Sequence, residues 1–137
     1  MPLTDTMRER LRAAFAGGPP LRLAVLFGSQ ATGRARPGSD FDIGIWPIDP
    51  DLPLHDELAL AAALSEAAGA EVDVVRLDVD APQLGAEVAR TGLCLFEGAP
   101  GTFAAFRAEA ISRWIDFEET IAPHRAVFLR RLAARAP

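Results

Sequence analysis

The sequence of 137 residues predicts one α/β domain, built on a small mixed β-sheet with helices mainly on one face. Half of its residues are hydrophobic, so a chain of this length can bury a substantial core. Short runs with strand patterning alternate with longer stretches whose composition favours helices, and Gly or Pro separates most of them. The acidic side chains of the strands are expected on the face that the helices leave exposed.

The expected elements follow from caps, periodicity and stop signals. In chain order they are a helix from 4–6 to about Phe15, strands at 23–27 and 40–46, a helix at 54–68, a strand at 71–77, a helix at 83–91, a strand at 93–96 and a C-terminal helical segment over about 102–135. The last segment carries an amphipathic stripe over 102–121, and Pro123 is expected to interrupt it before a helix at 126–134. The stripe either covers the sheet or forms an interface with a second copy or a partner protein.

Charge and composition exclude several classes of protein. The net charge of −5 disfavours bulk nucleic-acid binding. The apolar stretches are too short to cross a bilayer, and Asp5 and Glu9 lie where a targeting peptide avoids acids, so a cytoplasmic protein without a membrane partner is expected. Cys94, the only cysteine, is expected to be a buried, reduced thiol. His55 and His124 have no metal-ligand spacing with each other or with Cys94.

The stretch from residue 23 to residue 46 gives the strongest functional signal. Its apolar strand ends at Gly28, and a glycine lets the backbone approach a ligand closely. If Ser29 to Thr32 opens a short helix, its free amide groups and hydroxyl group suit a phosphate. We therefore predict a phosphate cradle at Gly28 and Ser29.

Two carboxylates follow on the next strand. Because side chains alternate along a strand, Asp40 and Asp42 share one face, while the apolar residues between and after them point to the other. Paired carboxylates on a half-buried strand repel each other and lose solvation unless a cation lies between them. Hard oxygen ligands favour Mg²⁺, which also binds phosphate oxygens. The pattern predicts phosphoryl or nucleotidyl transfer.

A third carboxylate, Asp73, lies within an otherwise apolar strand. On its own, such an Asp more often marks an edge or exposed position. Beside Asp40 and Asp42 it meets the requirements of a two-metal nucleotidyl transfer. Asp40 and Asp42 would hold both ions, and Asp73 would complete one metal site and accept the proton of an attacking hydroxyl. Arg34 and Arg36 in the connecting loop either contact the triphosphate or carry ordinary solvated charge.

The run Gly28-Ser29, ten further residues, Asp40-Phe41-Asp42 and then Asp73 resembles the signature of the DNA polymerase beta-like nucleotidyltransferase superfamily. More narrowly, it is similar to the minimal nucleotidyltransferases (MNT) that act as antitoxins to HEPN-domain toxins. The resemblance covers roughly residues 21–97, as the catalytic core of a single nucleotidyltransferase domain over 1–137. Many relatives carry an Arg soon after the Gly-Ser pair, where this chain has Gln30-Ala31-Thr32. That departure leaves the phosphate-binding arginine unassigned.

The resemblance implies a nucleotidyltransferase fold, two Mg²⁺ ions, ATP as substrate, and transfer of AMP to a hydroxyl group, typically of a Tyr, of a cognate HEPN ribonuclease toxin. This chain contains no Tyr, so a tyrosyl acceptor belongs to another protein, and a hetero-oligomer with the toxin is expected.

Two alternatives stay open at this stage: an antitoxin that mainly binds and occludes its toxin, and a transferase that modifies a small-molecule hydroxyl. The three acids favour catalysis over occlusion. The roughly forty residues after the core are few for an acceptor domain, which disfavours the small molecule.

Overall fold

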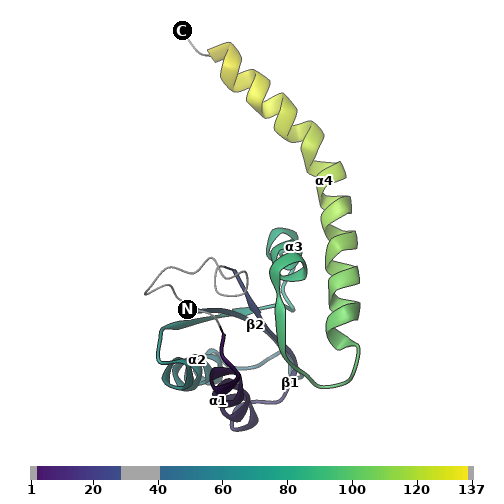
Figure 1. Ribbon diagram of the computed structural model, residues 1–137. Helices are drawn as coiled ribbons and strands as arrows, with labels where there is room; N and C mark the ends of the chain where they lie inside the picture. The colour runs from purple at the N-terminus through teal and green to yellow at the C-terminus, as the bar shows by residue number, and fades with distance from the viewer. Residues whose placement is uncertain (1–2, 29–40, 136–137) are drawn as a thin grey trace.

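In the computed structural model, which describes residues 3–28 and 41–135, four helices pack around or extend from a four-stranded sheet (Figure 1). In chain order the elements are α1 (Asp5–Ala16), β1 (Leu21–Phe27), β2 (Phe41–Pro47), α2 (Leu54–Ala68), β3 (Val72–Arg76), α3 (Pro82–Thr91), β4 (Leu93–Glu97) and α4 (Thr102–Arg135). The predicted stop signals act as expected, because Gly17, Gly69 and Gly92 follow the ends of the first three helices. The α/β fold class is confirmed.

The sheet is mixed and has the strand order β3-β2-β1-β4. β1 lies between β2 and β4 and pairs antiparallel with both, whereas β2 and β3 run parallel. Parallel neighbours need a crossover connection, and α2 supplies it. This crossover brings the first residues of β3 beside the first residues of β2, and Asp42 and Asp73 lie there.

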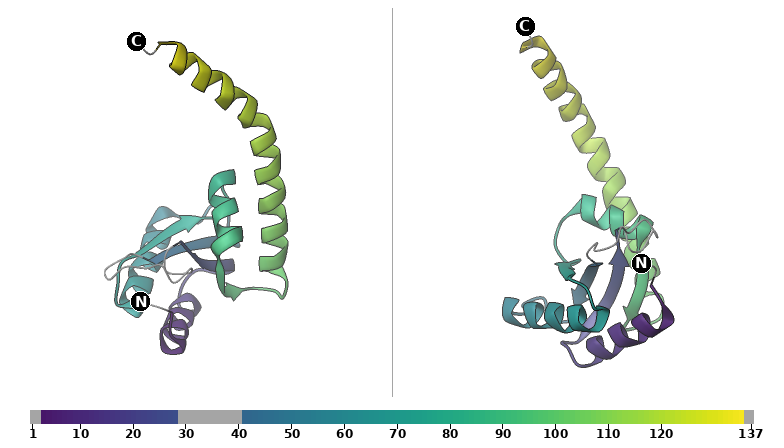
Figure 2. Two further views of the ribbon diagram at one scale, coloured as in Figure 1. Left: turned by 45° about the horizontal axis from the view of Figure 1, so that its top comes forward. Right: turned by 60° about the vertical axis from the view of Figure 1, so that its left-hand side comes forward.

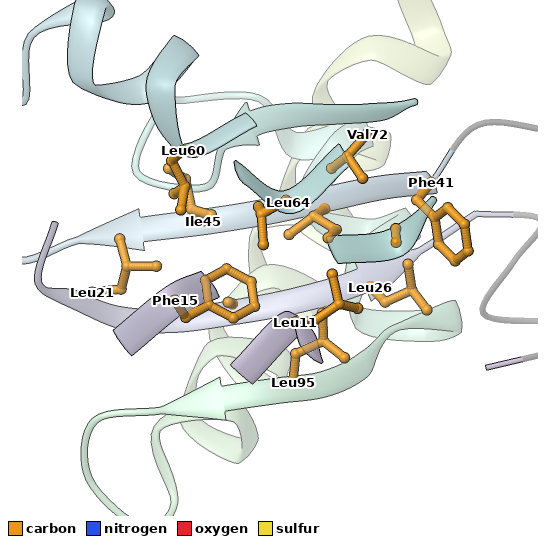
Figure 3. Packing of buried hydrophobic residues seen from close by; sticks show 13 residues of the cluster. Leu11, Phe15, Leu21, Leu26, Phe41, Ile45, Leu60, Leu64, Val72 and Leu95 are labelled. Atoms are coloured by element: carbon orange, nitrogen blue, oxygen red, sulfur yellow. The ribbon is translucent and has the colours of Figure 1, made fainter. Parts of the chain in front are cut away.

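One face of the sheet is closed by α1 and α2. Their buried residues, with alternate side chains of the strands, form the larger hydrophobic cluster (Figure 3). Leu11 from α1, Leu64 from α2 and Ile43 from β2 are completely buried there. Burying a side chain of this size stabilises the fold by about 1.5–3 kcal/mol. This face therefore serves as the scaffold of the domain.

The opposite face is also covered, so the expectation of helices mainly on one face was wrong. Leu23, Val25 and Phe27 point to this side of β1 and are buried with Val88 of α3. Phe103 and Phe106 at the start of α4 pack against the same cluster. β1 is apolar on both faces because it is a central strand, and each face needs a cover. Asp42 and Asp73 lie at one end of this second face, where Asp42 is the neighbour of Phe27.

The C-terminal segment is one helix of 34 residues rather than two. Pro123 lies inside α4, where sequence analysis had expected an interruption. A proline removes one backbone hydrogen bond and kinks a helix without necessarily ending it, and α4 bends partway along its length (Figures 1 and 2). Only the first half of α4 lies beside α3 and the sheet, and the second half stands clear of the domain (Figure 2).

Two further expectations concern surface and redox chemistry. Across the described ranges 3–28 and 41–135, no helix has both the length and the apolarity needed to cross a bilayer. Cys94 is a free thiol on β4, half-buried rather than fully buried, and its burial raises the pKa of the thiol.

Candidate active site

The turn at the end of β1 requires a glycine for two independent reasons. Gly28 has a φ of 80°, a backbone conformation that other residues adopt only at a cost. In addition, a Cβ atom at this position would lie 2.8 Å from Oδ2 of Asp42. The turn therefore sits directly against a carboxylate, and any side chain at Gly28 would push that carboxylate away.

Asp42 and Asp73 are direct neighbours across two parallel strands. The register of β2 and β3 pairs Asp42 with Asp73, and on the other side of β2 Asp42 pairs with Phe27, the last residue of β1. Adjacent strands lie about 4.8 Å apart, so Gly28 and the two carboxylates occupy three neighbouring strand ends. Asp42 is half-buried and Asp73 is exposed. Asp42 and Asp73 thus lie side by side on one face of two adjacent strands.

This pair of carboxylates fits a magnesium site. Both side chains offer hard oxygen donors, and two like charges this close gain from a cation between them. Among the residues that the structure describes, no set of three or more His, Cys, Asp or Glu side chains gathers into a metal site. The third predicted acid, Asp40, lies outside those residues, as do Ser29, Arg34 and Arg36. His55 and His124 are exposed.

Thr91 is a site residue that sequence analysis did not find. Its hydroxyl group accepts a hydrogen bond from the Gly28 amide at 3.5 Å and donates one to the Glu87 carbonyl oxygen at 2.8 Å. The last turn of α3 is thereby joined to the turn at the end of β1. No motif signals this contact, because Thr91 and Gly28 are 63 residues apart in sequence.

A cavity of about 710 Å³ opens further along the same face of the sheet. Trp46 of β2 and Leu77, just after β3, contribute to its wall, and Phe106 and Ala110 of α4 lie across from them. The connection from β3 to α3 forms the rim, where Arg76 makes two hydrogen bonds to Asp78, at 2.8 and 2.6 Å.

The rim is held in shape by this ion pair. Arg76 also donates a hydrogen bond to the Pro50 carbonyl oxygen at 3.1 Å, which ties the rim to the loop after β2. Both side chains of the pair are mostly buried. The hydrogen bond from Arg76 lowers the pKa of Asp78, and the same contact raises the pKa of Arg76. Sequence analysis had singled out neither residue.

Comparison with known proteins identifies the fold family. The family model described as polymerase beta, nucleotidyltransferase matches residues 9–100. None of the curated proteins matches the sequence significantly. The structure of a protein assigned as a minimal nucleotidyltransferase is 33% identical, with a TM-score of 0.55, and the match covers 68% of this chain and 95% of that one.

Two further similar structures contain toxin–antitoxin pairs. One is a toxin–antitoxin complex with AMP-PNP, whose matched chain is 24% identical with a TM-score of 0.78, covering 89% of this chain and 98% of that one. The other is a tri-AMPylated HEPN toxin from Shewanella oneidensis in complex with an MNT antitoxin, 22% identical with a TM-score of 0.72, covering 90% of this chain and 96% of that one. At these identities the likeness shows a shared fold.

Proposed function

Because the chain belongs to the polymerase beta nucleotidyltransferase family, we propose that it is an antitoxin that transfers AMP from ATP to a hydroxyl group of a HEPN-domain toxin. The observation that carries this proposal is the register that sets Asp42 beside Asp73, with Gly28 on the next strand. Two carboxylates and a side-chain-free turn at adjacent strand ends suit a metal-bound triphosphate.

In the proposed reaction the chain mainly positions and neutralises its substrate. Gly28 and Ser29 bind the triphosphate, with Arg34 and Arg36 as candidates for further phosphate contacts. Asp40 and Asp42 would hold two Mg²⁺ ions, which neutralise the triphosphate and the pyrophosphate leaving group. Asp73 would complete one metal site and accept the proton of the attacking hydroxyl, for which its exposure on the open strand end is suitable.

The acceptor is proposed to be a Tyr of the partner toxin. This chain has no Tyr, so a tyrosyl acceptor must come from another molecule. The relatives support a toxin as the acceptor and ATP as the donor: one similar structure contains a tri-AMPylated HEPN toxin with an MNT antitoxin, and another was solved with AMP-PNP. A hetero-oligomer with the toxin follows from the same proposal.

A second candidate function is inhibition by binding alone. The exposed second half of α4 favours it, because Phe128 and Leu129 are 59% and 56% exposed and would be covered in a complex. In this case the chain would silence the toxin without modifying it.

Intact mass spectrometry separates the two functions. The chain is incubated with ATP, Mg²⁺ and a candidate HEPN-domain protein from the same gene neighbourhood, and the partner's mass is then measured. The proposal predicts one or more AMP-sized increments on the partner, and a loss of its ribonuclease activity that depends on ATP. Full inhibition of an unmodified partner would instead establish inhibition by binding and overturn the transfer.

A further inference from the structure

The first and second halves of α4 carry an apolar stripe on the same side of the helix, interrupted by Arg113 and His124. We call it the α4 stripe, and it consists of Phe106, Ala110, Phe117, Ile121, Phe128 and Leu132. The spacing alternates between four and seven residues, which keeps the six side chains on one side of a helix with about 3.6 residues per turn. The stripe therefore continues in one direction from the domain to the end of the helix.

The exposure of the α4 stripe rises along the helix. Ala110 is buried and Phe106 packs against the cluster under α3, whereas Phe117 and Ile121 are only half-buried. Phe128 and Leu132 are 59% and 46% exposed. Nothing in the described part of the chain covers this distal end, where α4 stands away from the domain (Figure 1). The segment that stands away from the domain spans only a few helical turns, and an unsupported helix that short is marginally stable in water, so a partner that buried its apolar side would stabilise it.

The proximal end of the α4 stripe opens into the cavity described above. Phe106 and Ala110 form part of the cavity wall opposite Leu77. Leu77 points to the same face of the sheet as Asp73, because the two residues are separated by an even number of positions along the strand. The distance from Asp73 to Leu77 along β3 is roughly 13 Å, the span of about four extended residues. A molecule that offers a hydroxyl to Asp73 can thus reach the cavity with the adjoining residues.

Two ion pairs lie beside this surface. Glu118 and Arg125 lie beside the stripe and approach each other within 3.9 Å, and Glu109 pairs with Arg113 at the cavity at 2.9 Å. Each pair is neutral as a unit, so a partner can cover it without isolating a charge. The surface suits an amphipathic helix with apolar residues in its centre and charges of both signs at its edges.

The comparisons associate this helix with complexes. The two matched chains from toxin–antitoxin structures cover 89% and 90% of this chain. The unmatched residues are therefore too few to remove α4 from the match: more than half of its 34 residues have a counterpart in each of those chains. The matched minimal nucleotidyltransferase is a shorter chain, since 95% of it covers only 68% of this one. A second copy of this chain is a weaker occupant, because it would bring no Tyr to Asp73.

We propose that the α4 stripe and the adjoining cavity form the docking surface for the acceptor toxin, with a helix of the toxin along α4 and the segment next to its acceptor hydroxyl in the cavity. This inference rests on the proposed function. It assigns binding to α4 and chemistry to the strand ends, so the two can be impaired separately.

Two pairs of variants test the docking surface. The first pair compares Phe128→Arg/Leu132→Arg with the control Ala126→Arg/Ala134→Arg. Both doubles add two arginines at exposed positions, but the control positions lie roughly 200° around the helix from the stripe. The second pair compares Ala105→Trp, which fills the cavity, with Ala104→Trp, an exposed neighbour that does not line it.

The measurements are toxin affinity by calorimetry, AMP transfer to the toxin by intact mass, and AMP-PNP affinity as a check on the strand-end site. The stripe variant should bind the toxin on the order of 100-fold more weakly, since buried aromatic anchors dominate interfaces. Transfer at limiting toxin should fall equally and recover at saturating toxin. Ala105→Trp should weaken binding roughly 10-fold. AMP-PNP affinity should stay unchanged in all four variants, and both controls should bind the toxin like the parent.

Each contrary outcome has a distinct meaning. Parent-like toxin binding by the stripe variant and by Ala105→Trp would overturn the docking surface and leave the proposed function standing. A parent protein that neither binds nor modifies the toxin would overturn the proposed function and this inference together. If light scattering showed the parent alone to be a dimer that the stripe variant dissociates, the stripe would belong to a second copy, and the proposal would also be overturned.

Discussion

The two faces of the sheet differ in how completely the chain closes them. Under α1 and α2, the larger cluster joins residues of both helices and of all four strands, and most of its members are fully buried. Under α3 and α4, the smaller cluster has, in the described part of the chain, only four buried members, Leu23, Val25, Phe27 and Val88. One end of that second face holds Gly28, Asp42 and Asp73, and the other opens into the cavity.

Because of this difference, the residues expected to set the stability and the residues proposed for catalysis lie on opposite faces of the sheet. The closed face buries most of the apolar area and should set the free energy of unfolding. The open face places polar groups at strand ends, where they cost little stability because they keep contact with water or with each other. Mutations on the closed face should therefore lower the free energy of unfolding, and mutations at the strand ends of the open face should lower the rate of AMP transfer.

The largest effect on stability is expected on the closed face. Leu64→Ala removes a fully buried side chain from the larger cluster and should lower the free energy of unfolding by about 2–5 kcal/mol. Leu58→Ala on the same helix is the matched control, because Leu58 is 60% exposed, and it should change stability by less than about 0.5 kcal/mol. Urea denaturation measures both. Equal losses in the two variants would mean that the closed face does not set the stability.

A pair of glycine variants distinguishes backbone strain from site geometry. Gly28 and Gly69 have similar φ values, 80° and 67°, so replacing either with Ala should cost about 1–2 kcal/mol of stability. A Cβ at Gly69 meets nothing within 4 Å, whereas at Gly28 it meets the carboxylate of Asp42 at 2.8 Å. Only Gly28→Ala should therefore reduce AMP transfer per folded molecule, by roughly 10-fold or more. Equal transfer rates in both variants would contradict the placement of Asp42 against this turn.

Much of this arrangement could be predicted from the sequence, because it depends on local signals. A few neighbouring residues are enough to predict the alternation around Asp42 and Asp73, the turn at Gly28 and the helix end at Gly69. Contacts between residues distant in sequence were not predictable: Thr91 meets Gly28 across 63 positions, and Arg76 donates a hydrogen bond to the Pro50 carbonyl oxygen across 26 positions. The effect of Pro123 was misjudged because a proline can either kink a helix or end it, and the neighbouring residues do not show which occurs. The helices on the second face were missed because their packing joins residues far apart in sequence, such as Val25 of β1 and Val88 of α3.

The smallest effect is expected at the rim of the cavity. Asp78→Asn removes the ion pair with Arg76 and, because the pair lies at the surface, should lower stability at neutral pH by about 0.2–1 kcal/mol. The pKa of Asp78 is lowered in the folded protein, so the pair stabilises the fold above the unfolded-state pKa and this contribution is lost as the pH falls through the folded-state pKa.

The stability difference between parent and Asp78→Asn should accordingly shrink as the pH falls below the ordinary pKa of an aspartate. Urea midpoints measured from neutral to acidic pH check this. The matched control is Glu109→Gln, whose partner Arg113 is largely exposed, and it should change stability by less than about 0.5 kcal/mol at any pH. A difference for Asp78→Asn that stayed constant with pH would rule out the ion pair as its cause.

The central claim is that Asp42 and Asp73 act together at the strand ends. The most direct measurement is the rate of AMP transfer from ATP to the HEPN toxin by Asp42→Asn and by Asp73→Asn, with Asp56→Asn in the exposed first turn of α2 as the control. Each of the first two variants should lose on the order of 1,000-fold in rate while unfolding at nearly the parent temperature, because a metal ligand is lost and no core contact is. The control should transfer AMP like the parent. Transfer at the parent rate by either Asp42→Asn or Asp73→Asn would contradict the account.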